Sequence, residues 1–126
     1  MREIEFRGKS VENGEWVYGL ISLTPLLDNI FGHYIATPKD SRIDYAKVKP
    51  DTIGQYTGLL DKNGVKIFEG DILKGFSPSP ERAHVVTYHA DVYSCGFVAF
   101  TDGGITAYIM LWYKGLYVAG NIYDNP

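Results

Sequence analysis

The chain has 126 residues, 45% of them hydrophobic, and is long enough to bury a core as one domain or as two small β subdomains. Its 14 glycines and 10 tyrosines, without long stretches of Ala, Glu, Lys and Leu at helical spacing, favour strands and turns over helices. The net charge of −3 argues against a general binder of nucleic-acid backbones, which needs clustered Lys and Arg.

Cysteine usage and hydropathy restrict the chain further. Cys95 is the only cysteine, which excludes an intrachain disulfide and a CxxC metal or redox site. The amino terminus is charged and lacks the apolar core of a signal peptide, and no run approaches the ~18 apolar residues that a spanning helix needs. We therefore expect a soluble intracellular protein with no membrane contact.

The first predicted strand covers residues 2–8, where polar and apolar residues alternate and place Ile4 and Phe6 on one face. A loop with Asn13-Gly14 follows and leads into a second strand over residues 15–23. Two strands joined by such a reversal indicate a β-meander.

Proline residues end the next two segments. Pro25 stops the second strand, because proline cannot donate to a β-ladder and holds the preceding residue extended. Residues 26–32 fit either one helical turn or an exposed loop. A short strand over residues 33–37 follows and is predicted to end before Pro38. We interpret the isolated His33 as solvent-facing or hydrogen-bonded rather than as a metal ligand.

Residues 39–51 carry mixed charge with Tyr45 among the basic residues. Phosphate contacts by the cations and base stacking by the tyrosine would suit a nucleic-acid-binding segment. Three aspartates in the same segment weaken that interpretation, and a solvated face is the usual alternative. The candidate nucleic-acid-binding residues are Lys39, Arg42, Tyr45, Lys47 and Lys49.

Residues 54–73 contain the strongest turn signals of the chain. Asn63-Gly64 between apolar runs predicts a tight type I′ hairpin turn. Glu69 and Asp71 flank Gly70 and could form a catalytic or metal-binding carboxylate pair. We favour the structural interpretation, in which they accept backbone N–H groups within a second turn. The stretch then serves as a hinge between two β subdomains, 1–69 and 70–126.

The second subdomain is predicted to be a small antiparallel barrel. Residues 83–90 and 96–101 form a hairpin with a five-residue loop between them. A reversal at residues 102–104 leads to two closing strands, over 105–112 and 116–122. Closure of such a barrel would remove exposed sheet edges.

Cys95 raises the question of nucleophilic catalysis, because His84, His89 and Asp91 precede it closely in the sequence. A cysteine nucleophile needs an imidazole within hydrogen-bond reach and a lowered pKa. Proximity within one hairpin is weak support, and a small buried cysteine is common. The sequence has no GxxxxGK[ST], GxGxxG, HExxH or GxSxG motif. We therefore predict a non-enzymatic protein with no catalytic residues, no cofactor and no metal site.

Six short motifs together resemble the YopX family of phage and prophage proteins, and they cover nearly the whole chain. They are Phe6-Arg-Gly, Trp16-Val-Tyr-Gly, Gly54-Gln-Tyr-Thr-Gly-Leu, Asp61-Lys-Asn-Gly, Glu69-Gly-Asp-Ile and Gly120-Asn-Ile-Tyr-Asp-Asn-Pro. The resemblance implies a cytoplasmic protein of a bacterial host cell, encoded by a mobile element, that is mainly β with a C-terminal SH3-like barrel. It implies no established activity. Family members commonly continue past the terminal Asn-Pro with an acidic, leucine-containing tail, whereas this sequence stops at Pro126.

Two functional hypotheses follow. The abundance of tyrosine on short strands favours a self-associating protein-binding or structural module, a homo-oligomer with a phage or host protein as a further partner. The alternative is a nucleic-acid-binding regulator of a mobile element that uses residues 39–49.

Overall fold

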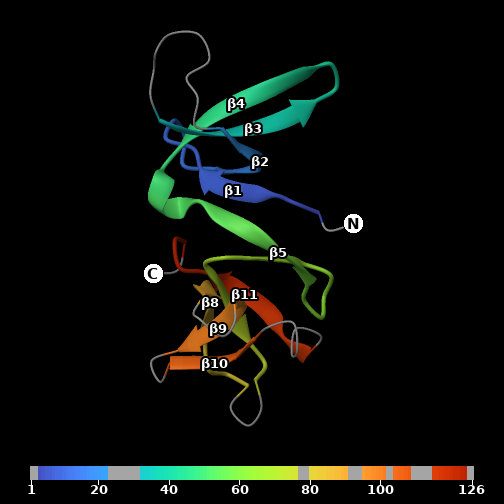
Figure 1. The fold of residues 1–126 in the computed structure, drawn as a ribbon, viewed down its shortest axis with the longest axis vertical. Helices are drawn as coiled ribbons and strands as arrows, with labels where there is room; N and C mark the ends of the chain where they lie inside the picture. Colours follow the sequence, from blue (N-terminus) through green and yellow to red (C-terminus); the bar gives the residue numbers. More distant parts are fainter. Residues whose placement is uncertain are drawn as a thin grey trace. The chain divides into compact units, whose positions relative to one another are not determined.

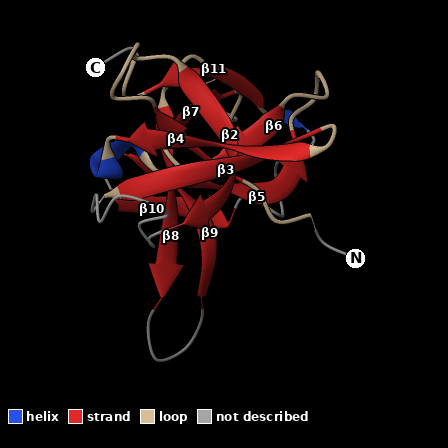
Figure 2. Cartoon of the chain, turned by 90° about the horizontal axis from the view of Figure 1, so that it is seen from above, coloured by secondary structure: helices blue, strands red, loops and turns tan. Residues whose placement is uncertain are grey.

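The computed structural model describes residues 3–22, 32–76, 80–90, 95–101, 104–108 and 115–124. The chain is mainly β with antiparallel pairing throughout, as predicted, and Figure 2 shows strands as nearly all of its regular structure. It divides into two compact units, Met1–Gln55 and Tyr56–Pro126. Figure 1 traces the elements in chain order.

Eleven strands and one short 3-10 helix make up the described regular structure. They are β1 (Phe6–Lys9), β2 (Trp16–Ser22), β3 (His33–Lys39), β4 (Arg42–Val48), η1 (Pro50–Thr52), β5 (Gly54–Leu60), β6 (Lys66–Phe68), β7 (Asp71–Lys74), β8 (His84–Ala90), β9 (Cys95–Thr101), β10 (Gly104–Tyr108) and β11 (Tyr117–Asn121).

The first unit is a meander that curls back on itself. Its strands lie in the order β4-β3-β2-β1, and the beginning of β5 pairs with β1 through Gly54 and Gln55. Beyond β1, Ser10 forms an isolated bridge with Val48 at the end of β4. The Lys49 N–H donates to the Lys9 carbonyl over 2.9 Å, which fastens this contact. The end of β1 and the residue after it therefore pair with the end of β4.

The core of this unit is small. Ile35 and Val48 are its fully buried apolar side chains among the described residues. Gly8 lies directly against Val48, where a Cβ atom would be 3.0 Å from the valine Cβ. Thr52 closes the other side, since its hydroxyl accepts the Lys9 N–H at 2.9 Å. Burial of about two large apolar side chains, at roughly 1.5 to 3 kcal/mol each, gives this sheet limited stabilisation.

Two strand boundaries in this unit correct the sequence predictions. The first strand begins at Phe6, and Ile4 is 62% exposed instead of sharing a buried face. The third strand continues through Pro38, which lies opposite Ile43 on β4. The pairing of β2 with β3 ends at Ala36, so the missing N–H of Pro38 interrupts no ladder. Residues 26–31 lie outside the described part.

The second unit contains a five-stranded sheet in the order β10-β9-β8-β7-β11. The predicted hairpin is confirmed, as β8 pairs with β9 from Val85 with Phe100 to Ala90 with Cys95. The last strand, β11, pairs with β7 rather than with its chain neighbour β10. No described pair joins β10 to β11, so the described strands form an open sheet, and full closure of a barrel remains a prediction.

The larger core lies in this second unit. Apolar side chains from four strands and two connecting segments pack together, with Leu59, Phe97 and Val118 partly buried against them. The buried members are Ile67, Leu73, Phe76, Val86, Ala99 and Leu116. Ile67 on β6 and Leu59 on β5 both belong to this core. The chain therefore divides between Gln55 and Tyr56. The predicted subdomains were 1–69 and 70–126, so the observed boundary lies earlier in the sequence. Residues 56–73 form the start of the second unit rather than a hinge.

The turn after β5 is a reversal, as predicted, but its type differs. Asn63 does not have a positive φ, whereas Gly64 has φ of 80°. The Gly64 N–H donates to the Asp61 carbonyl, and the Asp61 N–H donates to the Val65 carbonyl. This is the pattern of a type I turn followed by a left-handed glycine, instead of a type I′ turn. The Asp61 carboxylate fills the turn and accepts the N–H groups of Asn63 and Val65, which favours the longer loop.

Candidate interaction surface

The five residues predicted for nucleic-acid binding all lie on or next to the β3–β4 hairpin. Lys39 and Arg42 pair across the strands at its tip, so their side chains share one face. Successive side chains of a strand point to opposite faces, so Asp44 shares that face with Arg42. By the same alternation, Tyr45 and Lys47 point to the opposite face.

Charge at the tip is partly cancelled. The Arg42 Nε donates to the Asp44 carboxylate at 2.9 Å, with the two side chains 74% and 44% exposed. An exposed ion pair of this kind contributes little to stability, but it lowers the net positive charge available to a phosphate. Lys49 follows β4, with its backbone N–H bonded to β1. The structure thus brings Lys39 and Arg42 together and separates them from Tyr45, and nucleic-acid binding stays a prediction.

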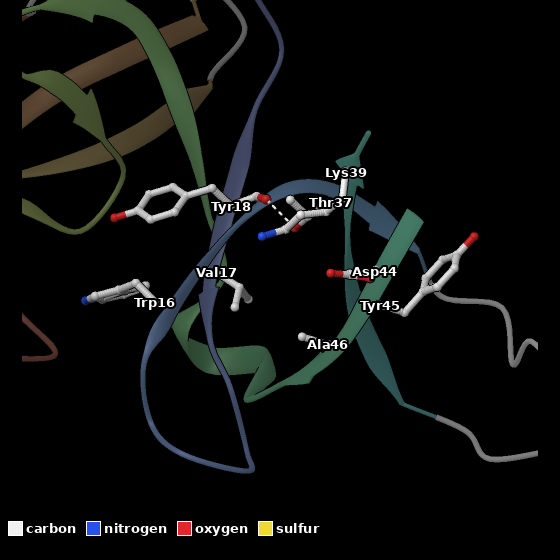
Figure 3. Close-up of a pocket in the computed structure, with 8 residues that line it drawn as sticks. All are labelled: Trp16, Val17, Tyr18, Thr37, Lys39, Asp44, Tyr45 and Ala46. Atoms are coloured by element: carbon white, nitrogen blue, oxygen red, sulfur yellow. Dashed lines mark hydrogen bonds between the residues drawn. The ribbon is translucent and has the colours of Figure 1, made fainter. Parts of the chain in front are cut away.

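A hollow of about 390 Å³ lies within the curl of the first unit. Figure 3 shows Val17, Asp44 and Ala46 directed into it, while Trp16, Tyr18 and Tyr45 point outward. The Thr37 hydroxyl donates to the Tyr18 carbonyl over 2.6 Å along one wall. The remaining wall residues are Thr37 and Lys39. The charged residues of this lining are Lys39 and Asp44, and Asp44 already bonds to Arg42. These two groups do not define a class of ligand for the hollow.

The outer face of the same sheet carries an apolar row. Leu20, Ala36 and Tyr45 are direct neighbours across β2, β3 and β4, because Leu20 pairs with Ala36 and Ala36 pairs with Tyr45. Leu20 is 52% exposed and Tyr45 42%. Ile43, two positions along β4 on the same face, is 53% exposed. We call these four residues the outer apolar row. Such a continuous exposed row on a sheet marks an interaction surface more often than scattered single residues do.

Asp71, one of the two carboxylates predicted in the second turn, has a structural role. Asp71 is buried, and its Oδ2 accepts the Phe68 N–H at 2.7 Å. This confirms the turn interpretation for Asp71. In the described part of the chain, no three His, Cys, Asp or Glu side chains are grouped so as to hold a metal ion.

Asp61 is a buried acid that sequence reasoning did not single out. Besides the two N–H groups of its own turn, its Oδ2 accepts the Val118 N–H from β11 at 2.8 Å. Burial alone raises the pKa of Asp61. The three backbone donors, beginning with Val118, and the nearby Lys62 ammonium outweigh this effect and lower the pKa below its ordinary value of 3.8. Asp61 therefore remains an anion that joins the hairpin to the last strand.

The structure does not bring His84 close to Cys95, as a catalytic pair would require. His84 is buried, its ring lies 4.3 Å from that of Phe76, and its Nδ1 is 3.2 Å from the Arg82 carbonyl. Cys95 pairs with Ala90 at the other end of β8, six residues or about 20 Å along the strand. Asp91 lies outside the described residues, as do the side chains of Cys95 and His89.

Comparison with known proteins identifies the family. The profile of the YopX protein family matches residues 5–126, essentially the whole chain. The chain belongs to the YopX family. The YopX fold seen here is similar to the crystal structure of protein EF1440 from Enterococcus faecalis, at 28% sequence identity and a TM-score of 0.51, over 100% of this chain and 97% of that one. A search of curated proteins gave no significant match to this YopX sequence.

The resemblance based on the six short motifs is thus confirmed at the level of the family. Among the described residues of this YopX protein, no helix has the length and apolar content needed to cross a membrane.

Proposed function

We propose that this YopX protein is a non-enzymatic intracellular binding module that associates with another copy of itself through its first unit. The observation that supports this most directly is the outer apolar row of Leu20, Ala36, Ile43 and Tyr45. Removal of exposed apolar area from water is the main favourable contribution to association between proteins. Tyrosine in particular is enriched at interfaces, because its ring is apolar while its hydroxyl can remain hydrated or hydrogen-bonded.

The location of this row also supports the proposal. It spans three neighbouring strands of a unit whose own core contains only Ile35 and Val48 as fully buried apolar side chains in the described part. A sheet with so small an inner core gains stability when its exposed apolar side chains are removed from water. Self-association provides that cover without any further component.

Multi-angle light scattering after size-exclusion chromatography tests the proposal. We expect a mass above that of one 14.1 kDa chain at micromolar concentration. Tyr45→Glu should shift the mass toward the monomer, because a charge would have to be buried in the contact. Val65→Glu is a matched control, since Val65 is 47% exposed but lies in the second unit. A purely monomeric wild-type protein at micromolar concentration would contradict self-association.

A further inference from the structure

We propose that two copies of this chain pair through the free edge of β4, antiparallel about a two-fold axis at Ile43. This inference rests on the self-association proposed above and adds the strand, the register and the contacts. It follows from the backbone groups at the edge of the sheet, from the charge pattern of β4 and from the exposure of its apolar side chains.

The backbone of β4 presents unpaired groups on the side away from β3. The Lys47 carbonyl and the Lys49 N–H bond to the segment of β1 and the residues just after it, so these two residues direct their backbone groups away from β3. In an antiparallel ladder the direction alternates with each residue. Ile43 and Tyr45 therefore also direct their N–H and C=O groups to the free side. Strand β4 is the end strand of its sheet, and among the described residues no strand pairs with residues 42–46 on the side away from β3.

The Ser10–Val48 bridge decides which residues can pair. It occupies β4 from Lys47 onward, so an added strand has residues 42–46 available. Antiparallel pairing through the free backbone groups can then place Ile43 opposite Ile43 of the second copy, or Ile43 opposite Tyr45. Tyr45 opposite Tyr45 is excluded, because Ile43 would then face Lys47, whose carbonyl already accepts the Val11 N–H. The second register sets Asp44 opposite Asp44, and two like charges in direct opposition are destabilising.

The first register is complementary in charge. With Ile43 on the axis, Arg42 of each copy faces Asp44 of the other, so these two residues each gain a partner of opposite sign. These two residues already bond to each other within one chain at 2.9 Å. Pairing would convert two isolated ion pairs into a network of four charges, which stabilises more than separate exposed pairs do.

The same register brings apolar side chains together. Ile43, 53% exposed in the single chain, would lie beside its own copy on the outer face. Tyr45 on each side extends the contact, and the outer apolar rows of the two copies become one continuous surface. An exposed edge with apolar residues is a ready template for an added strand. A second copy is the partner whose charges fit it without further assumption.

Proline at the axis tests the backbone part of the proposal. Ile43→Pro removes an N–H that faces away from β3, so β3–β4 pairing should survive while the added strand loses a central donor. We expect the dissociation constant from sedimentation equilibrium to rise by about tenfold or more, with an unchanged circular dichroism spectrum. Ile43→Val keeps the N–H and the branched apolar side chain and should associate like the wild type. Equal association of the Pro and Val variants would overturn the edge pairing.

Charge reversal tests the register independently of proline. Arg42→Asp and Asp44→Arg should each weaken homodimers about tenfold, because every cross-copy pair then has like charges. An equimolar mixture of the two variants should recover association, since one copy is then acidic at positions 42 and 44 while the other is basic at both. The double variant R42D/D44R should also recover it. Failure of the mixture to associate better than either variant alone would overturn this register.

The outcomes separate the two proposals. A wild-type oligomer unaffected by Ile43→Pro and by charge reversal would leave self-association standing and overturn the β4 edge as its site. A wild-type monomer would overturn both. Loss of association in the proline and single-charge variants, with recovery in the mixture, supports both.

Discussion

At the scale of single residues, Asp61 shows where sequence reasoning was adequate and where it fell short. A turn at residues 61–64 could be predicted from Asn-Gly, since glycine adopts positive φ at little cost. The contact from Asp61 to Val118 could not, because the two residues are 57 positions apart and no local pattern encodes the pairing of β11 with β7. Asp71 lay within reach of prediction because its partner, Phe68, is three residues away.

Asp61→Asn should destabilise the protein by about 1 to 3 kcal/mol, because the amide NH₂ cannot accept and a buried backbone N–H loses its partner. Urea denaturation followed by circular dichroism measures the loss. Asp51→Asn serves as the control, since Asp51 is an exposed aspartate on η1. Equal stability of the Asp61 and Asp51 variants would contradict the joining role of Asp61.

The lowered pKa of Asp61 also predicts a pH dependence. The unfolded state takes up a proton near the ordinary pKa of 3.8, while the folded state resists protonation. The stabilisation is therefore complete above about pH 5 and decreases as the pH falls toward the lower pKa of the folded state. Unfolding free energies measured as the pH is lowered from about 6 to about 2.5 should fall more steeply for wild type than for Asp61→Asn. Parallel curves would show that Asp61 is not the titrating group.

At the scale of elements, the turns of residues 61–71 hold the second unit in register. The Gly70 N–H donates to the Val86 carbonyl and the Gly70 carbonyl accepts the Ile122 N–H, so this one turn connects to β8 and to the end of β11. Local signals predicted both turns, the hairpin of β8 with β9 and most strand positions. They did not predict the pairing of β11 with β7, nor that Pro38 stays within a strand, because both depend on which neighbour each strand meets.

Gly70→Ala should cost more stability than Gly64→Ala. Both glycines have positive φ, 88° and 80°. An alanine is strained there by about 1 to 2 kcal/mol. A Cβ on Gly64 meets nothing within 4 Å, whereas on Gly70 it would lie 2.8 Å from the Tyr123 ring. Thermal unfolding of the two variants measures the difference. Introduction of Tyr123→Ala into both should make the costs similar, and a persistent difference would point to a cause other than the ring.

At the scale of the whole molecule, the two units differ in how much apolar surface they bury. In the described residues, the first unit has Ile35 and Val48 as its buried apolar side chains, while the second has a cluster of six. Composition suited either one domain or two small β subdomains, and the size of each core depends on the strand order and on the placement of β5 and β6. The candidate surface was likewise only partly predictable. Tyr45 and Arg42 were singled out, but for nucleic acid, because the outer apolar row becomes visible only once the register of β2, β3 and β4 is known.

The first unit should therefore open more readily than the second. Native-state hydrogen exchange should show faster exchange at Ile35 and Ala46 than at Leu73 and Val86, since protection follows buried apolar contacts. Because association would bind only the folded first unit, its protection should rise with protein concentration, and that of the second unit should change less. Uniform protection in both units, independent of concentration, would contradict unequal stability.

The bridge between Ser10 and Val48 has a consequence for how far assembly can proceed. In a two-fold pair each copy uses the same edge, so the edge is consumed in both partners at once and no equivalent edge is left to recruit a third chain. The bridge also removes the end of β4 that a strand shifted in register would need to grow into a staggered fibre. In the proposed pair, two-fold symmetry would thus limit growth through β4 to two copies, and the bridge at Ser10 would block the shifted registers.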